Sequence, residues 1–515
     1  MKTQIFKPYA QKQMMILPPN LEEMIPEKHL VRVVDKMVEE LDKKILWGQY
    51  KGGGTSAYDP IMMLKVILYA YTQQVFSSRR IAKELRENIN YLWLSGMSYP
   101  DHRTINRFRG TVMKRIIEEV FYGIVEQLLE LGYVDLKSYF MDGTKIEANA
   151  NRYSFVWRKS TEKNKEKLRE KVSQLLEEID VLEEREEKQY GEKDLEEMGE
   201  GSVVTAEKLK EAAKKINERL KQTPENKKLK QAQKKLESDF IPRLEKYEQY
   251  EEILEERNNF SKTDQDATFM RMKEDHMRNG QLKPGYNIQM GTQNQFILGY
   301  SLHRRAGDTS CLKKHVEKFK TAFGQYPENL IADAGYGSEE NYSYMEEKEM
   351  EVYVKYSSFH YEQKRNYKKK KPYRAENFEY FQEEDEYGCP QGKRLHYLYT
   401  KPNKSENGFV SERRIYECEN CSQCPVKTEC TRAQHNRRIQ IGVELERLKK
   451  KARDNLLSQT GLEMRSKRPI EVEAVFGRLK QNWGFRRFFL RGLDKVNTEW
   501  GLLSIAHNIA KTAVQ

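Results

Sequence analysis

The stretch KSYFMDGTKIEAN, residues 137–149, marks the point where the chain changes from a helical to a strand-like pattern. An apolar run ends at Asp142, and a second strand-like run follows from Lys145. A similar stretch, NLIADAGYGS at residues 329–338, ends an apolar run at Asp333 before a Gly-rich turn. An acid at the end of a buried strand must be paired, hydrogen-bonded or bound to metal. Strand ends are also where the sites of α/β sheets gather, so the two segments predict an α/β core with an acidic site.

A third carboxylate is predicted in RPIEVEAVFGRLKQNWGFRRFFLRG, residues 468–492. On a regular helix, at about 100° per residue, Glu473 and Lys480 border one apolar stripe. Glu471 falls on the opposite face and is expected to face solvent. The alternative for Glu473 is an ordinary ion pair on the helix surface. The apolar stripe consists of Val472, Phe476, Leu479 and Trp483.

Three carboxylates from separated segments suit the cleavage of a phosphodiester. The reaction needs an aligned nucleophilic oxygen and stabilisation of charge on two oxygens, which two Mg²⁺ ions about 3.5–4 Å apart supply. Mg²⁺ prefers carboxylate oxygens and retains several waters. Asp142, Asp333 and Glu473 are therefore the predicted ligands of two Mg²⁺ or Mn²⁺ ions. Lys480 is predicted to contact a scissile or flanking phosphate.

At these residues the chain resembles the DDE transposases of bacterial insertion sequences. The resemblance runs from about residue 15 to 512, without the inserts, and is carried by PDHRTINRFR, MDGTKIEANANRY, KPGYNIQ, ADAGYGSEENY, IEVEAVFGRLK and GFRRFFLRG. It implies an α/β RNase H-like catalytic core, interrupted by a coiled-coil helical insertion and a Cys-rich insertion, with an all-α N-terminal DNA-binding domain. It also implies that Asp142, Asp333 and Glu473 hold the metal for cleavage at element ends and strand transfer into target DNA.

Related transposases carry a Tyr-Arg-Glu-Lys signature around the Glu. Lys480 matches this signature seven residues after Glu473. The Tyr is missing, and the nearest Arg, Arg468, stands five residues before the Glu rather than four. The resemblance therefore leaves the role of Arg468 open.

Composition and pattern divide the chain into six predicted segments. Leu168, Val172, Leu175, Ile179 and Leu182 repeat at spacings of four and three, which is typical of a coiled-coil seam. This helical insertion either dimerises the protein or packs against its own chain. The segments are a helical domain at 1–135, the first core strands at 136–157, the helical insertion at 158–258, the continued core at 259–356, a basic Cys-rich insertion at 357–465 and the Glu helix with a basic tail at 466–515.

Basic residues indicate a polyanionic partner. The formal net charge is +12, and Lys and Arg release counterions when they neutralise phosphates. A helix-turn-helix pattern in residues 1–135 fits DNA binding and a plain helical bundle equally well. The candidate DNA contacts are Arg103, Arg107, Arg109, Arg486, Arg487 and Arg491.

Five of the six cysteines cluster in the Cys-rich insertion. Such close spacing suits one tetrahedral Zn²⁺, although an iron–sulfur cluster would use the same four thiolates. The segment also resembles the Cys-rich insert of some of these transposases, and a structural role is expected. Cys311 stands alone and is predicted to be a core residue. The five candidates for four positions are Cys389, Cys418, Cys421, Cys424 and Cys430.

The remaining expectations concern partners and location. The most apolar stretch, residues 61–71, contains Lys65 and is too short to span a bilayer, so no membrane contact is expected. A cytoplasmic, nucleoid-associated bacterial protein that pairs double-stranded element ends as a homodimer is predicted. The alternatives are a nuclease without strand transfer, a catalytically inactive DNA-binding protein or end-binding repressor, and a coiled-coil scaffold. Asp308 is predicted to cap the helix from Thr309 and is the best substitute for one of the three acids.

Overall fold

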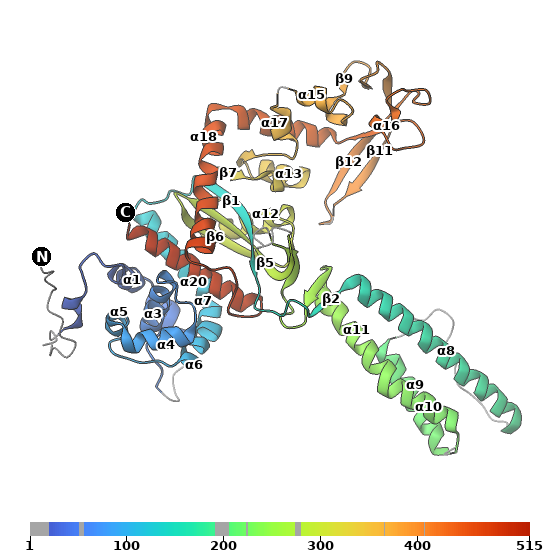
Figure 1. The fold of residues 1–515 in the computed structure, drawn as a ribbon, viewed down its shortest axis with the longest axis horizontal. Helices are drawn as coiled ribbons and strands as arrows, with labels where there is room; N and C mark the ends of the chain where they lie inside the picture. Colours follow the sequence, from blue (N-terminus) through green and yellow to red (C-terminus); the bar gives the residue numbers. More distant parts are fainter. Residues whose placement is uncertain are drawn as a thin grey trace, which may run out of the picture.

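A mixed six-stranded sheet forms the centre of the protein (Figure 1). The computed structural model describes residues 20–50, 56–190, 205–222, 225–272, 280–364, 366–405 and 407–514. The strand order is β4-β5-β1-β7-β8, with β6 paired to β5. Helices pack on this sheet, so the predicted mixed α/β fold is confirmed at this level. The strands are β1 (Ser138–Glu147), β4 (Thr268–Arg271), β5 (Leu282–Gln293), β6 (Phe296–His303), β7 (Asn329–Ala332) and β8 (Glu351–Val354).

Strand β1 differs from its prediction because it does not end at Asp142. It stays paired with antiparallel β5 up to Glu147, which makes the two predicted runs one strand. Its parallel pairing with β7 stops at Phe140, opposite Ile331. Asp142 therefore lies just beyond the end of the β1–β7 ladder, although it is in the middle of its own strand.

The N-terminal helices share one hydrophobic core with the sheet. Helix α20 (Leu493–Thr512) is buried along most of its length, because it contacts α3, α7 and β6. Asp59 caps α3, since its carboxylate accepts the backbone N–H groups of Ile61 and Met62. The other helices are α1 (Leu30–Glu39), α2 (Lys43–Trp47), α3 (Pro60–Thr72), α4 (Ser78–Glu87), α5 (Ile89–Leu94), α6 (His102–Arg107) and α7 (Lys114–Glu130).

The helical insertion projects away from the sheet on a small two-stranded base (Figure 1). Its own core buries the predicted seam residues Leu168, Val172, Leu175 and Ile179 against the helices that follow. In this structure the seam residues pack on helices of their own chain. The side chain of Leu182, the last of the predicted seam residues, lies outside the described residues. The elements are β2 (Phe155–Trp157), α8 (Arg158–Tyr190), α9 (Ala206–Gln222), α10 (Lys227–Lys235), α11 (Ile241–Leu254) and β3 (Asn259–Ser261).

Residues between β8 and the Glu helix build a second, five-stranded sheet with the order β13-β12-β11-β10-β9. Helices α17 (Val443–Leu457) and α18 (Gln459–Arg468) lead from it back to the central sheet. No helix in the described ranges is long and apolar enough to cross a membrane. The strands are β9 (Glu379–Phe381), β10 (Glu386–Gly388), β11 (Arg394–Lys404), β12 (Val410–Cys418) and β13 (Arg438–Ile441), with short helices α14 (Phe359–Glu362), α15 (Tyr367–Lys370) and α16 (Lys427–Cys430).

Candidate active site

Three acidic side chains from distant parts of the chain converge on the guanidinium of Arg468. Its Nη2 lies 3.0 Å from Oδ2 of Asp142 and 3.9 Å from Oδ2 of Asp333. Its Nη1 lies 2.9 Å from Oε1 of Glu473. The Arg468 side chain is only 9% exposed, whereas those of Asp333 and Glu473 are about half exposed. The structure thus brings the three predicted acids together, and we call this group the carboxylate site.

The topology of the sheet explains why two of these acids meet. Strands β1 and β7 are parallel neighbours, and Asp333 follows Ala332, the last residue of β7. Asp142 lies two residues beyond the last β1–β7 pair, so both carboxylates emerge at the same edge of the sheet. The backbone N–H of Gly143 donates to Oδ1 of Asp142 at 2.8 Å, which leaves Oδ2 directed at Arg468.

A π-helical turn sets the relation between Arg468 and Glu473. Residues Pro469–Glu473 form this turn, in which the N–H of Ala474 bonds to the carbonyl of Pro469, five residues earlier. In a π turn, residues five apart lie one turn apart on the same face, as residues four apart do in an α-helix. The five-residue spacing, which departs from the four-residue family signature, is thereby accommodated, and the two side chains form an ion pair.

The prediction for Glu471 is wrong. Its side chain is buried rather than solvent-facing, and its carboxylate accepts the backbone N–H of Gln295 at 2.7 Å. Burial raises the pKa of the Glu471 carboxyl. The regular 100° phase fails because the π turn rotates this part of the helix toward the β5–β6 turn. The predicted apolar stripe is confirmed, since Val472, Phe476, Leu479 and Trp483 are all buried.

Lys480 lies beside the same strand as Asp142. Its Nζ is 3.1 Å from the hydroxyl of Thr144, two residues after Asp142 and therefore on the same face of β1. The side chain is largely buried. A second π-helical segment, Arg478–Asn482, carries it. Lys480, which was expected near the acids, thus contacts the strand that carries Asp142.

The six arginines predicted to contact DNA fall into two groups. Arg109 is 2% exposed and donates to the hydroxyl of Tyr71 and the carbonyl of Phe76, so a DNA contact by this side chain is contradicted. It lies four residues after the buried Ile105, and therefore on the face of the helix that points to the core. The other five arginines are exposed: Arg103, Arg107, Arg486, Arg487 and Arg491.

Asp308 does not cap the helix that follows it, because its side chain makes no capping hydrogen bond. Its carboxylate instead accepts from Nδ2 of Asn287 at 2.7 Å and from Nε2 of Gln289 at 3.0 Å. Sequence reasoning missed these two amides. The available signal was a pair of polar residues at alternate positions of a strand-like segment, which places both side chains on one face.

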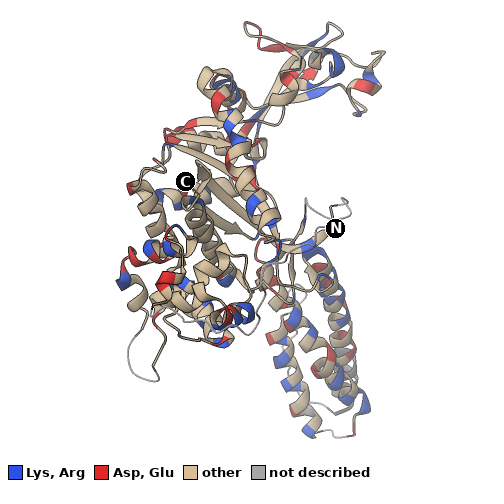
Figure 2. Cartoon of the chain, turned by 60° about the vertical axis from the view of Figure 1, so that its left-hand side comes forward, with Lys and Arg blue, Asp and Glu red and all other residues tan. Residues whose placement is uncertain are grey.

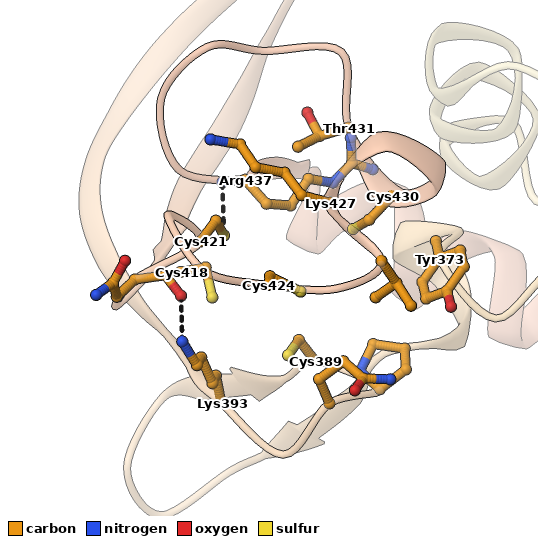
Figure 3. Close-up of a pocket in the computed structure, with 14 residues that line it drawn as sticks. Tyr373, Cys389, Lys393, Cys418, Cys421, Cys424, Lys427, Cys430, Thr431 and Arg437 are labelled. Carbon is orange, nitrogen blue, oxygen red and sulfur yellow. Dashed lines mark hydrogen bonds between the residues drawn. The ribbon is translucent and has the colours of Figure 1, made fainter.

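Five cysteines of the second sheet line one cavity, together with Lys393, Lys427 and Arg437 (Figure 3). The backbone N–H of Arg437 donates to Sγ of Cys421 at 3.4 Å. Burial, with a contribution from the thiol of Cys421, raises the pKa of Cys418 to about 12. Within the described ranges, no group of three or more His, Cys, Asp or Glu residues is arranged to hold a metal ion. Cys311 lies apart and buried, as predicted for a core residue. The five cysteines are Cys389, Cys418, Cys421, Cys424 and Cys430.

Two segments of the chain match family models of transposases. Residues 388–513 match the transposase DDE domain, and residues 19–111 match the transposase domain DUF772. The first match contains Glu473 and the Cys-lined cavity, whereas Asp142 and Asp333 lie outside both matches. These matches confirm the predicted resemblance to DDE transposases of insertion sequences.

Two curated relatives are similar to a shorter part of the chain. Both are described as a probable transposase for insertion sequence element ISH11, from two strains of Halobacterium salinarum. Each is 29% identical over 115 residues, which are 22% of this chain. The matched part spans 33% of the length of each relative. No solved structure matches the chain.

Proposed function

We propose that this protein is a DDE transposase that cleaves DNA at the ends of an insertion sequence and joins the freed ends to target DNA. The observation that carries the proposal is the convergence of Asp142, Asp333 and Glu473 on one guanidinium at the edge of the sheet. The two transposase family matches support it. We further propose that the central sheet is an RNase H-like core and that the six predicted segments are its domains and insertions.

The carboxylate site suits divalent metal ions. A DDE transposase domain implies dependence on divalent metal in general. Asp142, Asp333 and Glu473 present hard oxygen atoms, as Mg²⁺ requires, and two of these side chains are open to solvent. The guanidinium of Arg468 shows that the three acids can share one cationic partner. Bound Mg²⁺ or Mn²⁺, as two ions, would activate the attacking oxygen and stabilise the leaving oxygen.

Residues around the acids have supporting roles in this proposal. Lys480 lies next to Thr144 and would contact the scissile or a flanking phosphate as a point charge. Arg468 would keep three like charges together before metal binds. In this proposal Arg468 therefore holds the acids in position, whereas Lys480 binds a phosphate of the DNA.

Double-stranded DNA is the proposed substrate, bound as element ends and as target by a homodimer. Exposed arginines on α6 and after the Glu helix would contact phosphates, which predicts strong salt dependence. Basic and acidic residues both occur all along the helices of the helical insertion (Figure 2). Ion pairs such as Lys165–Glu251 and Lys210–Glu245 account for part of this mixture. We therefore assign DNA binding to the α6 surface and the basic tail, in a nucleoid-associated cytoplasmic protein.

We also propose that four of the five clustered cysteines bind a structural Zn²⁺. The thiols come from two separate stretches, residue 389 and residues 418–430, and nevertheless line one cavity. Thiolate ligands suit Zn²⁺ and leave no hard oxygen position for catalysis by Mg²⁺. A structural role follows from this choice of ligands.

A cleavage and joining assay on duplex DNA that carries the element ends tests the proposed function. Wild-type protein with Mg²⁺ or Mn²⁺ is expected to nick the ends and join them to target DNA. The variants Asp142→Asn, Asp333→Asn and Glu473→Gln are expected to lose both steps and to retain DNA binding. Glu463→Gln, an exposed carboxylate on α18, is the matched control. Unchanged activity in any of the three variants removes that residue from the site, and end binding without cleavage by wild-type protein supports an end-binding repressor instead.

A further inference from the structure

A buried polar cluster lies behind the carboxylate site, on the opposite face of β1 from Asp142. In the β1–β5 ladder, Gly143 pairs with Gln289 and Lys145 pairs with Asn287. Paired residues of an antiparallel ladder point to the same face, and successive residues alternate between faces. Both amides are fully buried. Burying an amide without hydrogen bonds costs free energy, so their partners matter.

The side chain of Gln289 joins three other polar groups. Its Nε2 donates to Oδ1 of Asp308 at 3.0 Å and to Oδ1 of Asn287 at 3.1 Å. Its Oε1 accepts the hydroxyl proton of Tyr336. Asn287 adds a second bond to Asp308, at 2.7 Å. We call Asn287, Gln289, Asp308 and Tyr336 the Gln289 cluster.

The residue after Asp142 must be glycine for this cluster to form. A Cβ atom at Gly143 would lie 2.6 Å from Nε2 of Gln289 and 2.7 Å from Oδ1 of Asp308. Both distances are shorter than carbon and a polar atom tolerate, and the two groups are held in place by each other. The absent side chain therefore provides the space that the amide and the carboxylate occupy directly behind Asp142.

The same cluster holds the loop that carries Asp333. Tyr336 follows Asp333 by three residues, is 1% exposed and reaches Gln289 through its hydroxyl. Nδ2 of Asn341 donates to the carbonyls of Tyr336 and Thr309, each at 2.9 Å. The hydroxyl of Thr309 donates to the carbonyl of Gly335 at 2.6 Å. The loop is thus fixed to β5 and to the segment after Asp308.

We propose that Gln289 and Tyr336 are positioning residues that fix Asp333 relative to Asp142. This inference rests on the proposed function, because it concerns the spacing of acids proposed to bind metal. Asp142 and Asp333 belong to a strand and a loop that share no backbone pairing at the acids themselves. The Gln289 cluster supplies the missing connection through side chains. Groups behind metal ligands typically change metal affinity by about 10–100-fold when removed.

A pair of Tyr→Phe variants separates positioning from simple loss of stability. Tyr336→Phe removes only the hydroxyl that reaches Gln289. Tyr342→Phe is the matched control, because this tyrosine is also buried and its hydroxyl donates to the carbonyl of Val354 at 2.9 Å. Both variants lose one buried hydrogen bond, so similar decreases in Tm are expected. Only Tyr336→Phe is expected to raise the Mn²⁺ concentration for half-maximal cleavage, by about tenfold, with DNA binding unchanged.

Mn²⁺ binding, followed by the electron paramagnetic resonance signal of free Mn²⁺, provides the second readout. Gln289→Leu, which removes both the N–H donor and the carbonyl acceptor of this amide, is expected to weaken Mn²⁺ binding more than Tyr336→Phe does. If Gln289→Leu does not fold, the two tyrosine variants still distinguish a positioning role from a simple loss of stability. Equal Mn²⁺ dependence in Tyr336→Phe and Tyr342→Phe would overturn the positioning role while leaving the proposed function intact. Wild-type protein that neither binds Mn²⁺ nor cleaves DNA would overturn the proposed function and this inference together.

Discussion

The carboxylate site and the Cys-lined cavity are both proposed metal sites, but the fold supports them differently. The acids of the carboxylate site stand on β1, on the loop after β7 and on the Glu helix, which belong to or border the large central core. Hydrogen bonds and Arg468 hold them. The cysteines stand on a small sheet whose fully buried core has six residues: Phe378, Leu395, Tyr416, Cys418, Cys421 and Ile439.

Two of those six core residues, Cys418 and Cys421, are themselves proposed metal ligands. At the carboxylate site the fold positions the ligands, so the geometry exists before metal arrives. In the second sheet two of the candidate ligands are part of the core, so we expect metal binding and folding to be coupled there. Loss of metal should therefore unfold the second sheet and leave the fold around the carboxylate site intact.

Removal of a clustered thiol should have the largest effect. Cys418→Ser is expected to lower the bound zinc from about one ion per chain to none and to expose residues 375–441 to proteolysis, because structural Zn²⁺ contributes on the order of 10 kcal/mol to folding. Zinc content and limited proteolysis measure this. Cys311→Ser, outside the cluster, is the control. Full zinc occupancy in Cys418→Ser would remove this cysteine from the ligand set.

Arg468→Ala should destabilise the metal-free protein and tighten divalent metal binding. The three acids would lose their shared cation, which should lower the free energy of unfolding by about 1–3 kcal/mol. This range already allows for solvent screening, because the side chains of Asp333 and Glu473 are half exposed. Thermal unfolding with and without Mn²⁺ measures both effects. Arg465→Ala, which removes a bond to the carbonyl of Leu456, is the control. An unchanged Tm in Arg468→Ala, or weaker Mn²⁺ binding, would contradict the proposed role of Arg468.

Glu471→Ala should destabilise the protein by about 1–3 kcal/mol, because it removes a buried carboxylate and leaves the partly buried N–H of Gln295 without its acceptor. Urea unfolding measures the loss. Glu463→Ala, on the exposed face of the preceding helix, should change the free energy of unfolding by less than about 0.5 kcal/mol. Equal effects of the two substitutions would show that Glu471 does not anchor the Glu helix.

A smaller effect is expected from Glu499, which lies buried on α20 and accepts the N–H groups of Phe489 and Leu490. Burial raises the pKa of its carboxyl to about 7, against an attraction from Arg109 that lowers it. Because the folded-state pKa is raised, the contribution of this group to stability is greatest below its unfolded pKa and is lost as pH rises toward 7. Glu499→Gln should flatten the dependence of Tm on pH between about pH 5 and 7. An unchanged slope would contradict the raised pKa.

Local patterns of the sequence were sufficient for several features. Apolar runs that end in acids located Asp142 and Asp333, and the apolar stripe of the Glu helix identified the buried face correctly. Asp before Pro is a typical start of a helix, and α3 begins at Pro60 with Asp59 as its cap. These features depend on residues close together in the sequence, so periodicity and capping preferences describe them.

Other features depend on helix irregularities and long-range contacts, which periodicity does not contain. Glu471 is buried where regular periodicity predicts exposure, because a π-helical turn carries it and the β5–β6 turn covers it. Arg109 is buried because it lies four residues after the buried Ile105, on the same face of the helix. The π-helical turn at Pro469–Glu473 also lets Arg468 pair with Glu473 at a spacing of five residues, which regular helical periodicity does not indicate. Asp308 was misassigned because its partners, Asn287 and Gln289, come from another strand.

Asp142, Asp333 and Glu473 are proposed to form together the metal site of a DNA-cleaving enzyme. Titration of Mn²⁺ into the protein bound to element-end DNA, followed by electron paramagnetic resonance, tests it most directly. Two Mn²⁺ ions per chain are predicted for wild-type protein and for Glu463→Gln. Each of Asp142→Asn, Asp333→Asn and Glu473→Gln is predicted to lose at least one of these ions. Wild-type Mn²⁺ binding in all three variants, or none in the wild-type protein, would contradict the claim.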